Sequence, residues 1–330
     1  MPQLLVSRRR ALAAAACAFL VTPSAFATNA AAWADKPIHL VVTGPAGGSA
    51  DVFARLVGDA LATQSGQTVV VENRPGAGGA IALKYMLSQP ADGLTLVVCA
   101  SNVLTEVPLV LKGGFDPLKD VKPVAALAKG TSVLVGSPTL PASDVKGLVA
   151  YLKGKPGQFG FASYSPGTSS QYAGLMFSKE AGLDLQHVPY PGSPPALVDV
   201  MSGRIPVMFD GLTTSKGLID SGKLKVFGVA SKSRSPQLPN VPTMTELGYP
   251  NLVFGNWMGV VASSKMAPEL VQKIHAALAH IGASPALKQR LLANGFDPIE
   301  DQPVDKLGQA VREEYERNAG IVKTYDIKLN

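Results

Sequence analysis

The sequence predicts an α/β fold, and three observations support this prediction. Hydrophobic residues make up 46% of the 330-residue chain and charged residues only 16%, so there are enough apolar side chains for a sizeable core. Gly and Pro occur 33 and 26 times, which favours many tight turns. Short apolar runs also alternate with segments of helical periodicity. Such alternation is typical of α/β domains, and a chain of this length predicts about two domains.

The first 27 residues have the pattern of an export signal. Three arginines at 8–10 precede an apolar run at 11–21, and this run is shorter than the ~20 residues that a membrane-spanning helix needs. Small residues then offer cleavage after Ala27 or after Ala34, and we expect cleavage after Ala27. The adjacent arginines leave both the Sec and the twin-arginine export routes open.

The charges, cysteines and histidines exclude several classes of site. Removal of residues 1–27 lowers the net charge from +6 to +3, because it takes away three arginines and no acid. No run of Lys and Arg is interleaved with aromatic residues, so we expect no nucleic-acid partner. Only Cys99 remains after cleavage, and we expect it to be a small buried hydrophobe. The four histidines are scattered, so no metal site is predicted.

Strand and helix patterns follow one another along the body of the chain. We expect strands at 38–43, 68–71, 94–100, 133–135, 159–163, 187–190, 205–210 and 225–230. We expect helices from 52, and at 80–88, 168–180, 194–201, 267–281, 285–293 and 304–323. Ser143 should cap a further helix with Asp144 in its first turn, and 253–262 is a long apolar stretch. Continuous apolar strands that are each followed by a helix predict a parallel sheet covered on both faces.

Two strand–loop–helix junctions have the composition of anion sites. Gly47-Gly48-Ser49 precedes one helix, and the segment 165–170, with sequence SPGTSS, precedes another. Glycines allow close approach of a ligand, and the free N–H groups at a helix start carry partial positive charge. A carboxylate, which only accepts hydrogen bonds, would suit two such loops. The alternative is that both are ordinary turns, which also favour Gly and Ser.

Two acidic residues stand near these loops. Asp51 lies in the first turn of its helix, where capping is the favoured interpretation and direct ligand contact the alternative. Asp210 ends a strand, at the edge where α/β sheets place ligands. For Asp210, ligand contact and a turn cap are equally compatible with the sequence.

An enzymatic alternative is a dinucleotide site at residues 44–48, with Glu72 as the ribose-binding acid. The match is partial, because Ala46 replaces the second glycine of the dinucleotide-binding motif. No P-loop lysine motif and no G-x-S-x-G nucleophile motif is present. An exported protein would also rarely meet a reduced cofactor.

Several motifs together resemble the Bug-type family, the periplasmic substrate-binding proteins of tripartite tricarboxylate transporters. The first half contains PAGGSAD at 45–51, VVENRPGAGG at 70–79 and ADGLTL at 91–96. The second half contains HVPYPGS at 187–193, VMFD at 207–210 and LPNVPT at 238–243. The resemblance spans nearly the whole chain after the signal.

The resemblance implies a type II periplasmic-binding-protein fold, with two α/β domains joined by two crossing strands and a ligand cleft between them. The expected domains are 35–131 plus 256–330, and 132–255. It also implies a monomeric periplasmic protein that is not an enzyme, uses no cofactor or metal, and delivers a small organic acid to the membrane subunits of such a transporter. A role as the ligand sensor of a signalling receptor is the alternative.

The residues implied to hold a di- or tricarboxylate or a related acid lie in three loops and at the edge of the second domain. They are Pro45, Gly47, Gly48, Ser49, Asp51, Ser101, Asn102, Ser163, Gly167, Thr168, Ser169, Tyr190 and Asp210.

The chain departs from the family pattern in the second loop. Tyr164 and Pro166 narrow and stiffen this loop, and Gln171-Tyr172 replaces the usual His-Leu pair. The resemblance therefore does not predict the size or the identity of the ligand.

Overall fold

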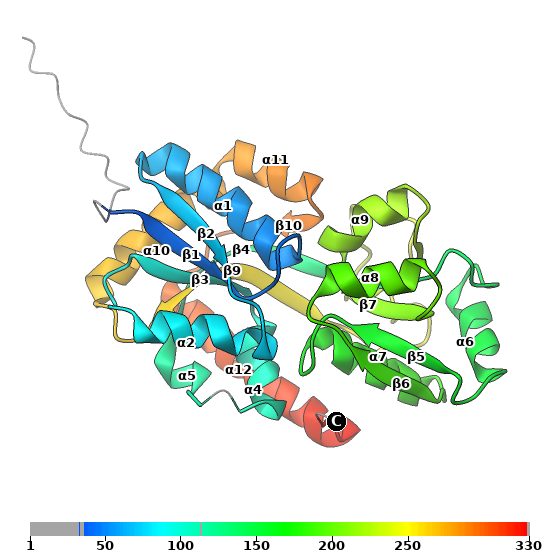
Figure 1. Cartoon of the computed structure of the whole chain (residues 1–330). Helices are drawn as coiled ribbons and strands as arrows, with labels where there is room; N and C mark the ends of the chain where they lie inside the picture. The colour runs from blue at the N-terminus through cyan, green and yellow to red at the C-terminus, as the bar shows by residue number, and fades with distance from the viewer. Residues whose placement is uncertain (1–32, 34–35, 113, 329–330) are drawn as a thin grey trace, which may run out of the picture. The chain divides into compact units, whose positions relative to one another are not determined.

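The computed structural model describes residues 33, 36–112 and 114–328, which belong to one compact unit (Figure 1). The signal peptide predicted at 1–27, together with Ala27 and Ala34 at the two candidate cleavage sites, lies outside the described residues.

Within the described part of the chain, one ten-stranded sheet runs in the order β2-β1-β3-β9-β4-β7-β5-β6, with β8 and β10 also paired to β4. The strands are β1 (Ile38–Val42), β2 (Val69–Asn73), β3 (Thr95–Ala100), β4 (Val121–Gly136), β5 (Phe159–Ser163), β6 (Leu185–Pro189), β7 (Val207–Gly211), β8 (Lys225–Val229), β9 (Gly255–Ser263) and β10 (Phe296–Pro298). We call the part built on β1–β3, β9 and β10 the first lobe and the part built on β5–β8 the second lobe.

Two long central strands run between the lobes (Figure 1). β4 pairs antiparallel with β9 from Val121 opposite Ser263 to Thr131 opposite Gly255. It then continues into the second lobe, where it pairs antiparallel with β7 and β8. The predicted parallel sheet is therefore present only in the outer strands, β1 with β2 and β3, and β5 with β6 and β7. At the centre the prediction is wrong, because strands that cross between lobes run in opposite directions.

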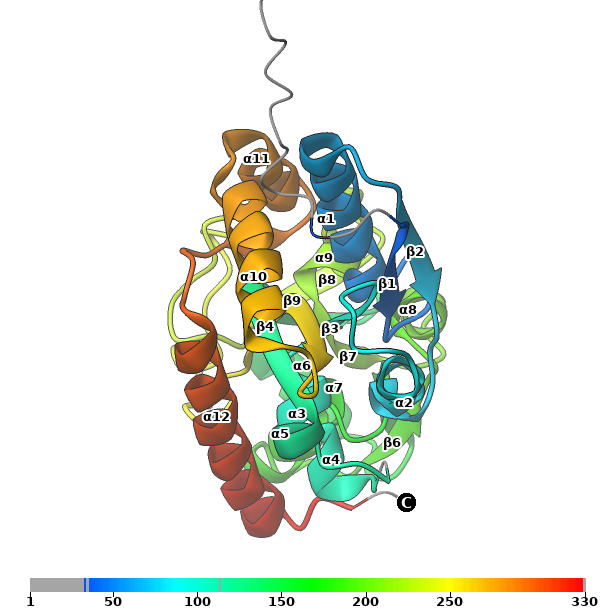
Figure 2. The same cartoon turned by 90° about the vertical axis from the view of Figure 1, so that its left-hand side faces the viewer.

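Helices cover both faces of the first-lobe sheet (Figures 1 and 2). The helices of the chain are α1 (Ser49–Ser65), η1 (Ala77–Gly79), α2 (Ala80–Ser88), α3 (Asn102–Thr105), α4 (Val107–Val110), α5 (Pro117–Asp120), α6 (Val145–Lys153), α7 (Ser169–Glu180), α8 (Ser193–Met201), α9 (Leu212–Asp220), α10 (Pro268–Ala283), α11 (Pro285–Ala293) and α12 (Val304–Tyr325). α1, α10 and α11 pack on one face, whereas α2, α3 and α12 pack on the other.

Two helix predictions need correction. The helix after β4 begins at Val145, and Asp144 rather than Ser143 is its N-cap, because the Asp144 carboxylate accepts the Gly147 N–H at 2.7 Å. α9 was not predicted, since its sequence LTTSKGLID is rich in residues with weak helix propensity.

Each lobe has its own hydrophobic core. Phe53 and Phe296 meet edge to face in the first lobe, where Cys99 is fully buried, as predicted. Burial raises the pKa of the Cys99 thiol to about 12. α12 connects both cores: Val311 packs in the first lobe, and Ile327, just beyond the helix, packs in the second.

Candidate functional site

A cavity of about 580 Å³ is lined by residues from both lobes. Its volume is within the usual range for small-molecule sites. Five chain segments contribute most of the lining: Thr43–Ala50, Pro75–Gly79, Tyr164–Ser169, Pro189–Ser193 and Gly211–Thr213. Each of these segments follows a strand and leads into a helix. The cavity therefore lies where helix N-termini from the two lobes face one another.

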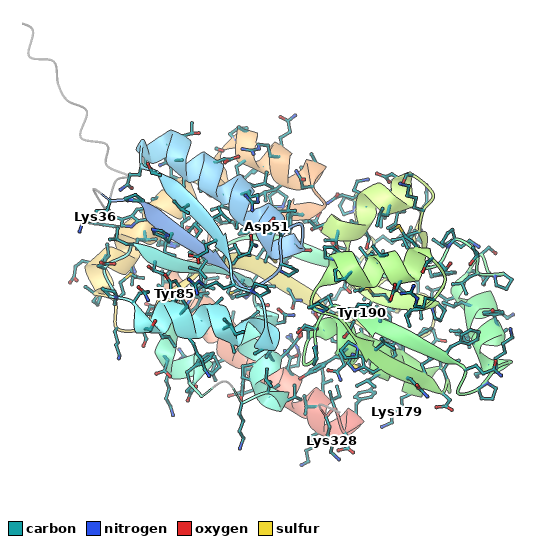
Figure 3. All side chains as sticks on the ribbon, in the orientation of Figure 1. Lys36, Asp51, Tyr85, Lys179, Tyr190 and Lys328 are labelled. Atoms are coloured by element: carbon teal, nitrogen blue, oxygen red, sulfur yellow. The ribbon has the colours of Figure 1, made fainter. Side chains whose placement is uncertain are left out.

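The loop between β1 and α1 forms the first wall. Pro45, Gly48 and Ser49 line the cavity, whereas Gly47 and Asp51 do not. Asp51 is 4% exposed, and its carboxylate accepts the Gly47 N–H at 2.9 Å. Burial would raise the pKa of Asp51, but hydrogen bonds from Arg55 and Gly47 together lower it. Asp51 thus supports the loop from behind; its label in Figure 3 marks the start of α1.

The loop between β5 and α7 forms the facing wall. Tyr164, Pro166, Thr168 and Ser169 line the cavity, whereas Ser163 and Gly167 do not. Gly167 has a φ of +76°, and its N–H donates to the Gln171 Oε1 at 2.7 Å. A Cβ at Gly167 would lie 2.8 Å from Val110 of α4. The glycine therefore permits close packing between this loop and α4.

His187, on β6, contacts residues on both sides of the loop between β5 and α7, which we call the second loop. Its Nε2 lies 2.7 Å from the Ser163 hydroxyl, and its Nδ1 lies 3.3 Å from the Gln171 side-chain amide. The ring stacks on Phe161 with centroids 5.2 Å apart. Burial lowers the pKa of His187 to about 4, so the ring is neutral at pH 7. This arrangement gives His187 a structural role at this loop.

The Ser169 hydroxyl, at the start of α7, contacts side chains of the second loop and of β9. It lies 2.9 Å from the Tyr164 hydroxyl and accepts the Asn256 side-chain amide at 3.0 Å. Asn256 belongs to β9 and also lines the cavity. Ser169 therefore joins the second loop to a central strand.

Glu106, between α3 and α4, lies behind Ser169 and is 2% exposed. Burial and the neighbouring Glu314 raise the pKa of Glu106 to about 8, although the amide and hydroxyl of Ser169 oppose this shift. The Glu106 Oε2 has no hydrogen-bond partner within the described part of the chain. This carboxyl is therefore mostly protonated at neutral pH.

The two residues predicted in the third loop have different places. Asn102 lines the cavity. Ser101 is fully buried and donates its hydroxyl to the Glu314 Oε1 at 3.0 Å. Ser101 thus connects the loop to α12 rather than facing the cavity.

Asp210 and Tyr190 also differ in position. Asp210 is fully buried and outside the lining, and its carboxylate accepts the hydroxyls of Ser193, Thr214 and Ser215, each at 2.6 Å. Burial raises the pKa of Asp210, although these hydroxyls oppose the shift. Tyr190 lines the cavity and is labelled in Figure 3. Its hydroxyl donates to the Asp199 carboxylate at 2.5 Å.

Sequence reasoning missed a substantial part of the lining. The turn at 75–79 was not predicted to line the cavity, although its glycines are a sequence signal for close approach of a ligand. Asn256, Met258 and Phe296 come from β9 and β10. These strands are far along the chain from the loops, so no local pattern marked them as cavity residues.

Among the residues that the structure describes, no Asp, Glu, His, Lys or Arg lines the cavity. In addition, no cluster of three or more His, Cys, Asp or Glu in the described ranges could hold a metal ion. None of the described helices is long and apolar enough to cross a membrane.

The two lobes share two central strands and enclose a small-molecule cavity. This arrangement is that of the solute-binding proteins. The chain belongs to the TctC family, described as the tripartite tricarboxylate transporter family receptor, which matches residues 53–327. The family and fold predicted from the motifs are thereby confirmed, and so is the prediction that the chain is a receptor and not an enzyme. The dinucleotide-dependent enzyme considered for residues 44–48 is excluded by this membership.

Known proteins agree with this assignment. BugT of Bordetella pertussis is 33% identical over 296 residues, which cover 89% of this chain and 90% of that protein. The structure of the periplasmic binding protein BugD is 28% identical, with a TM-score of 0.83, and covers 89% of this chain and 99% of BugD.

Two further solved relatives were determined with a ligand. The R. palustris protein Rpa4515 with adipate is 29% identical, with a TM-score of 0.86, and covers 90% of this chain and 99% of that one. MatC from Rhodopseudomonas palustris with bound malate is 27% identical, with a TM-score of 0.80, and covers 87% of this chain and 99% of MatC.

Proposed function

We propose that this receptor captures a small carboxylate in the cavity between its lobes and delivers it to the membrane subunits of a tripartite tricarboxylate-type transporter. The observation that carries the proposal is the convergence of helix N-termini from both lobes on one cavity. Amides at helix starts attract anions without a cationic side chain. The adipate and malate held by two relatives support a carboxylate as the ligand.

The thirteen predicted ligand residues have two roles in this proposal. Seven line the cavity and are proposed to meet the ligand: Pro45, Gly48, Ser49, Asn102, Thr168, Ser169 and Tyr190. The other six lie behind the lining and are proposed to hold the loops in place: Gly47, Asp51, Ser101, Ser163, Gly167 and Asp210.

The proposed motion is a hinge between two domains, 35–131 plus 256–330 and 132–255. Both boundaries lie on the central strands, since β4 spans Val121–Gly136 and β9 spans Gly255–Ser263. Bending of two neighbouring strands would open or close the cavity, with no chemical step. The protein is proposed to act as a monomer in the periplasm, after export directed by residues 1–27.

Thermal-shift screening of mono-, di- and tricarboxylates tests the proposal. Ligand at ~100 times its Kd should stabilise the protein by about 2.7 kcal/mol. Ser49→Ala should weaken the binding of an acid by about tenfold, because it removes a hydroxyl donor to a charged group. The matched control is Ser202→Ala, since Ser202 is exposed and lies outside the lining.

The proposal fails if no acid in a broad panel stabilises the protein, or if Ser49→Ala and Ser202→Ala bind equally well. Mass spectrometry of gently purified protein would identify a ligand that is retained through purification.

A further inference from the structure

The loop before α1 touches the start of α8 at a place far from the central strands (Figure 1). Pro45 follows β1 and Gly192 follows β6. In the sheet, β3 separates β1 from β9, and β7 and β5 separate β6 from β4. A Cβ at Gly192 would overlap the Pro45 Cγ and lie 3.0 Å from the Pro45 Cδ. The Pro45 ring therefore fills the space that a side chain at position 192 would need.

Gly192 is one of two N-cap glycines that face the loop before α1. Gly192 precedes α8 and Gly211 precedes α9. A Cβ at Gly211 would lie 3.0 Å from the Ser49 Oγ. The buried Asp210 carboxylate holds the two helix starts together, because it accepts hydroxyls from the first turns of both α8 and α9. The two N-cap glycines therefore form one fixed surface of the second lobe.

The loop before α1 is fixed by its own lobe. The Asp51 carboxylate accepts the Gly47 N–H at 2.9 Å and pairs with Arg55. The Asn73 side-chain amide donates to the Gly44 carbonyl at 3.0 Å. Each side of the contact is thus held by a buried acid of its own lobe, Asp51 on one side and Asp210 on the other.

The contact at Gly192 is made by packing alone. Among the described residues, no hydrogen bond or ion pair joins the loop 43–51 to the second lobe. Elsewhere, hydrogen bonds join the two proposed domains: the Gln237 amide donates to the Asp297 carboxylate at 3.2 Å, and the Tyr172 hydroxyl donates to the Glu106 carbonyl at 3.0 Å.

The position and the chemistry of this contact suit a part of the molecule that opens. Rotation about the central strands displaces distant points most. Separation of the loop 43–51 from the N-cap glycines would leave no buried polar group without its partner. The cavity can therefore open on the side of Pro45 at little cost, while the hydrogen-bonded side holds the domains together.

We infer that the packing of Pro45 on Gly192 is the contact that closes the cavity, and that Gly192 sets ligand affinity through closure, because a side chain there would hold the lobes apart. The inference rests on the proposed function, in which the domains move as a hinge, and assigns the place where the hinge closes. A clash that exists only in the closed form lowers the affinity for every ligand that needs this form, and by the same factor.

Spin labels measure closure directly. Lys84→Cys on α2 and Val198→Cys on α8 place one label at an exposed position of each proposed domain, and Cys99 is fully buried. Double electron–electron resonance on the exported protein, without acid and with malate or adipate, should show a closed population at the label distance of the described conformation. Gly192→Ala should lower the ratio of closed to open molecules by about tenfold.

Two further variants separate the clash from backbone strain. Pro45→Ala removes the Cγ and Cδ, so in its presence Gly192→Ala should lower the ratio by no more than about twofold. Gly248→Ala also has a positive φ, +94°, but no atom within 4 Å, and should leave the ratio unchanged. The inference is overturned if the closed population is absent under all three conditions, if Gly192→Ala does not reduce it, or if Pro45→Ala does not restore it.

Affinity gives a second readout and separates the inference from the proposed function. Calorimetry with malate and adipate should give a Kd about tenfold higher for Gly192→Ala than for Gly248→Ala. Equal Kd values in these two variants would overturn the inference and leave the proposed function standing. Failure of every acid in the broad panel, with a closed population that still responds to Gly192→Ala, would overturn the proposed function and leave the closing contact standing.

Discussion

At the scale of single residues, several acidic side chains are buried in this protein. Glu106, Glu314 and Asp210 are each less than 9% exposed, and burial raises the pKa of each of them. The Glu314 carboxylate accepts hydrogen bonds from the hydroxyls of Ser101 and Thr105. The acid next to Glu106 is therefore already hydrogen-bonded. Tyr164, Tyr172 and Arg317 also interact electrostatically with Glu106.

Glu106 predicts a pH dependence of stability. Its pKa rises from 4.5 to about 8 on folding, so between these values the native state binds a proton that the unfolded state has lost. The free energy of unfolding should therefore fall as the pH rises through this window. Glu106→Gln should flatten the fall, as measured by urea unfolding from pH 5 to pH 8. Glu316→Gln, at an exposed position on α12, is the control; equal slopes in the two variants would refute the prediction.

Asp210 predicts a loss of stability on neutralisation. Asp210→Asn keeps the shape but places an amide donor among three hydroxyl donors, so it should cost about 1–3 kcal/mol in the free energy of unfolding. Asp220→Asn, at an exposed position on the following helix, should change it by less than about 0.5 kcal/mol. Chemical denaturation of both variants at pH 7 provides the comparison, and similar losses would show that Asp210 has no special role.

At the scale of elements, the sequence predicted the outer strands and the long helices well. Their β-branched runs and helical periodicity are local signals. The long strand β4 was predicted only at 133–135, because its first part, VKPVAALAKG, contains Pro and several alanines that disfavour strands. Pairing with β9, more than a hundred residues later, decides its conformation. The Gly-rich loops of the cavity could be predicted from the sequence, because turn-forming residues are a local signal.

The loop before α7 gives a prediction at this scale. Gly167→Ala introduces a side chain at a positive φ and also against Val110. Gly222→Ala has the same backbone cost, with φ at +69°, but no atom within 4 Å. The Gly167 variant should therefore lose about 1–2 kcal/mol more in the free energy of unfolding than the Gly222 variant. Equal losses would mean that the contact between loop and α4 relaxes without cost.

At the scale of the whole molecule, one contact near the start of the described chain bears on processing. The Trp33 Nε1 donates to the Gly93 carbonyl at 3.0 Å, and the Trp33 ring packs against the first-lobe core. Cleavage after Ala34 would remove this residue, whereas cleavage after Ala27 would keep it. We expect the exported protein to begin at Thr28, which N-terminal sequencing or intact-mass measurement can check. A mature chain beginning at Asp35 would contradict the expectation.

The last turn of α12 and the segment that follows it are bound to the second lobe. The Lys328 carbonyl accepts the Gln171 side-chain amide at 3.3 Å, and the Thr324 carbonyl accepts the Lys179 ammonium at 3.3 Å, close to the region labelled by Lys179 and Lys328 in Figure 3. Gln171 is also the residue that fixes Gly167. A nascent chain therefore lacks one support of this loop until residue 328 has been synthesised and has folded back. For the same reason, a purification tag attached after this segment risks disturbing ligand binding at a loop more than 150 residues away in sequence.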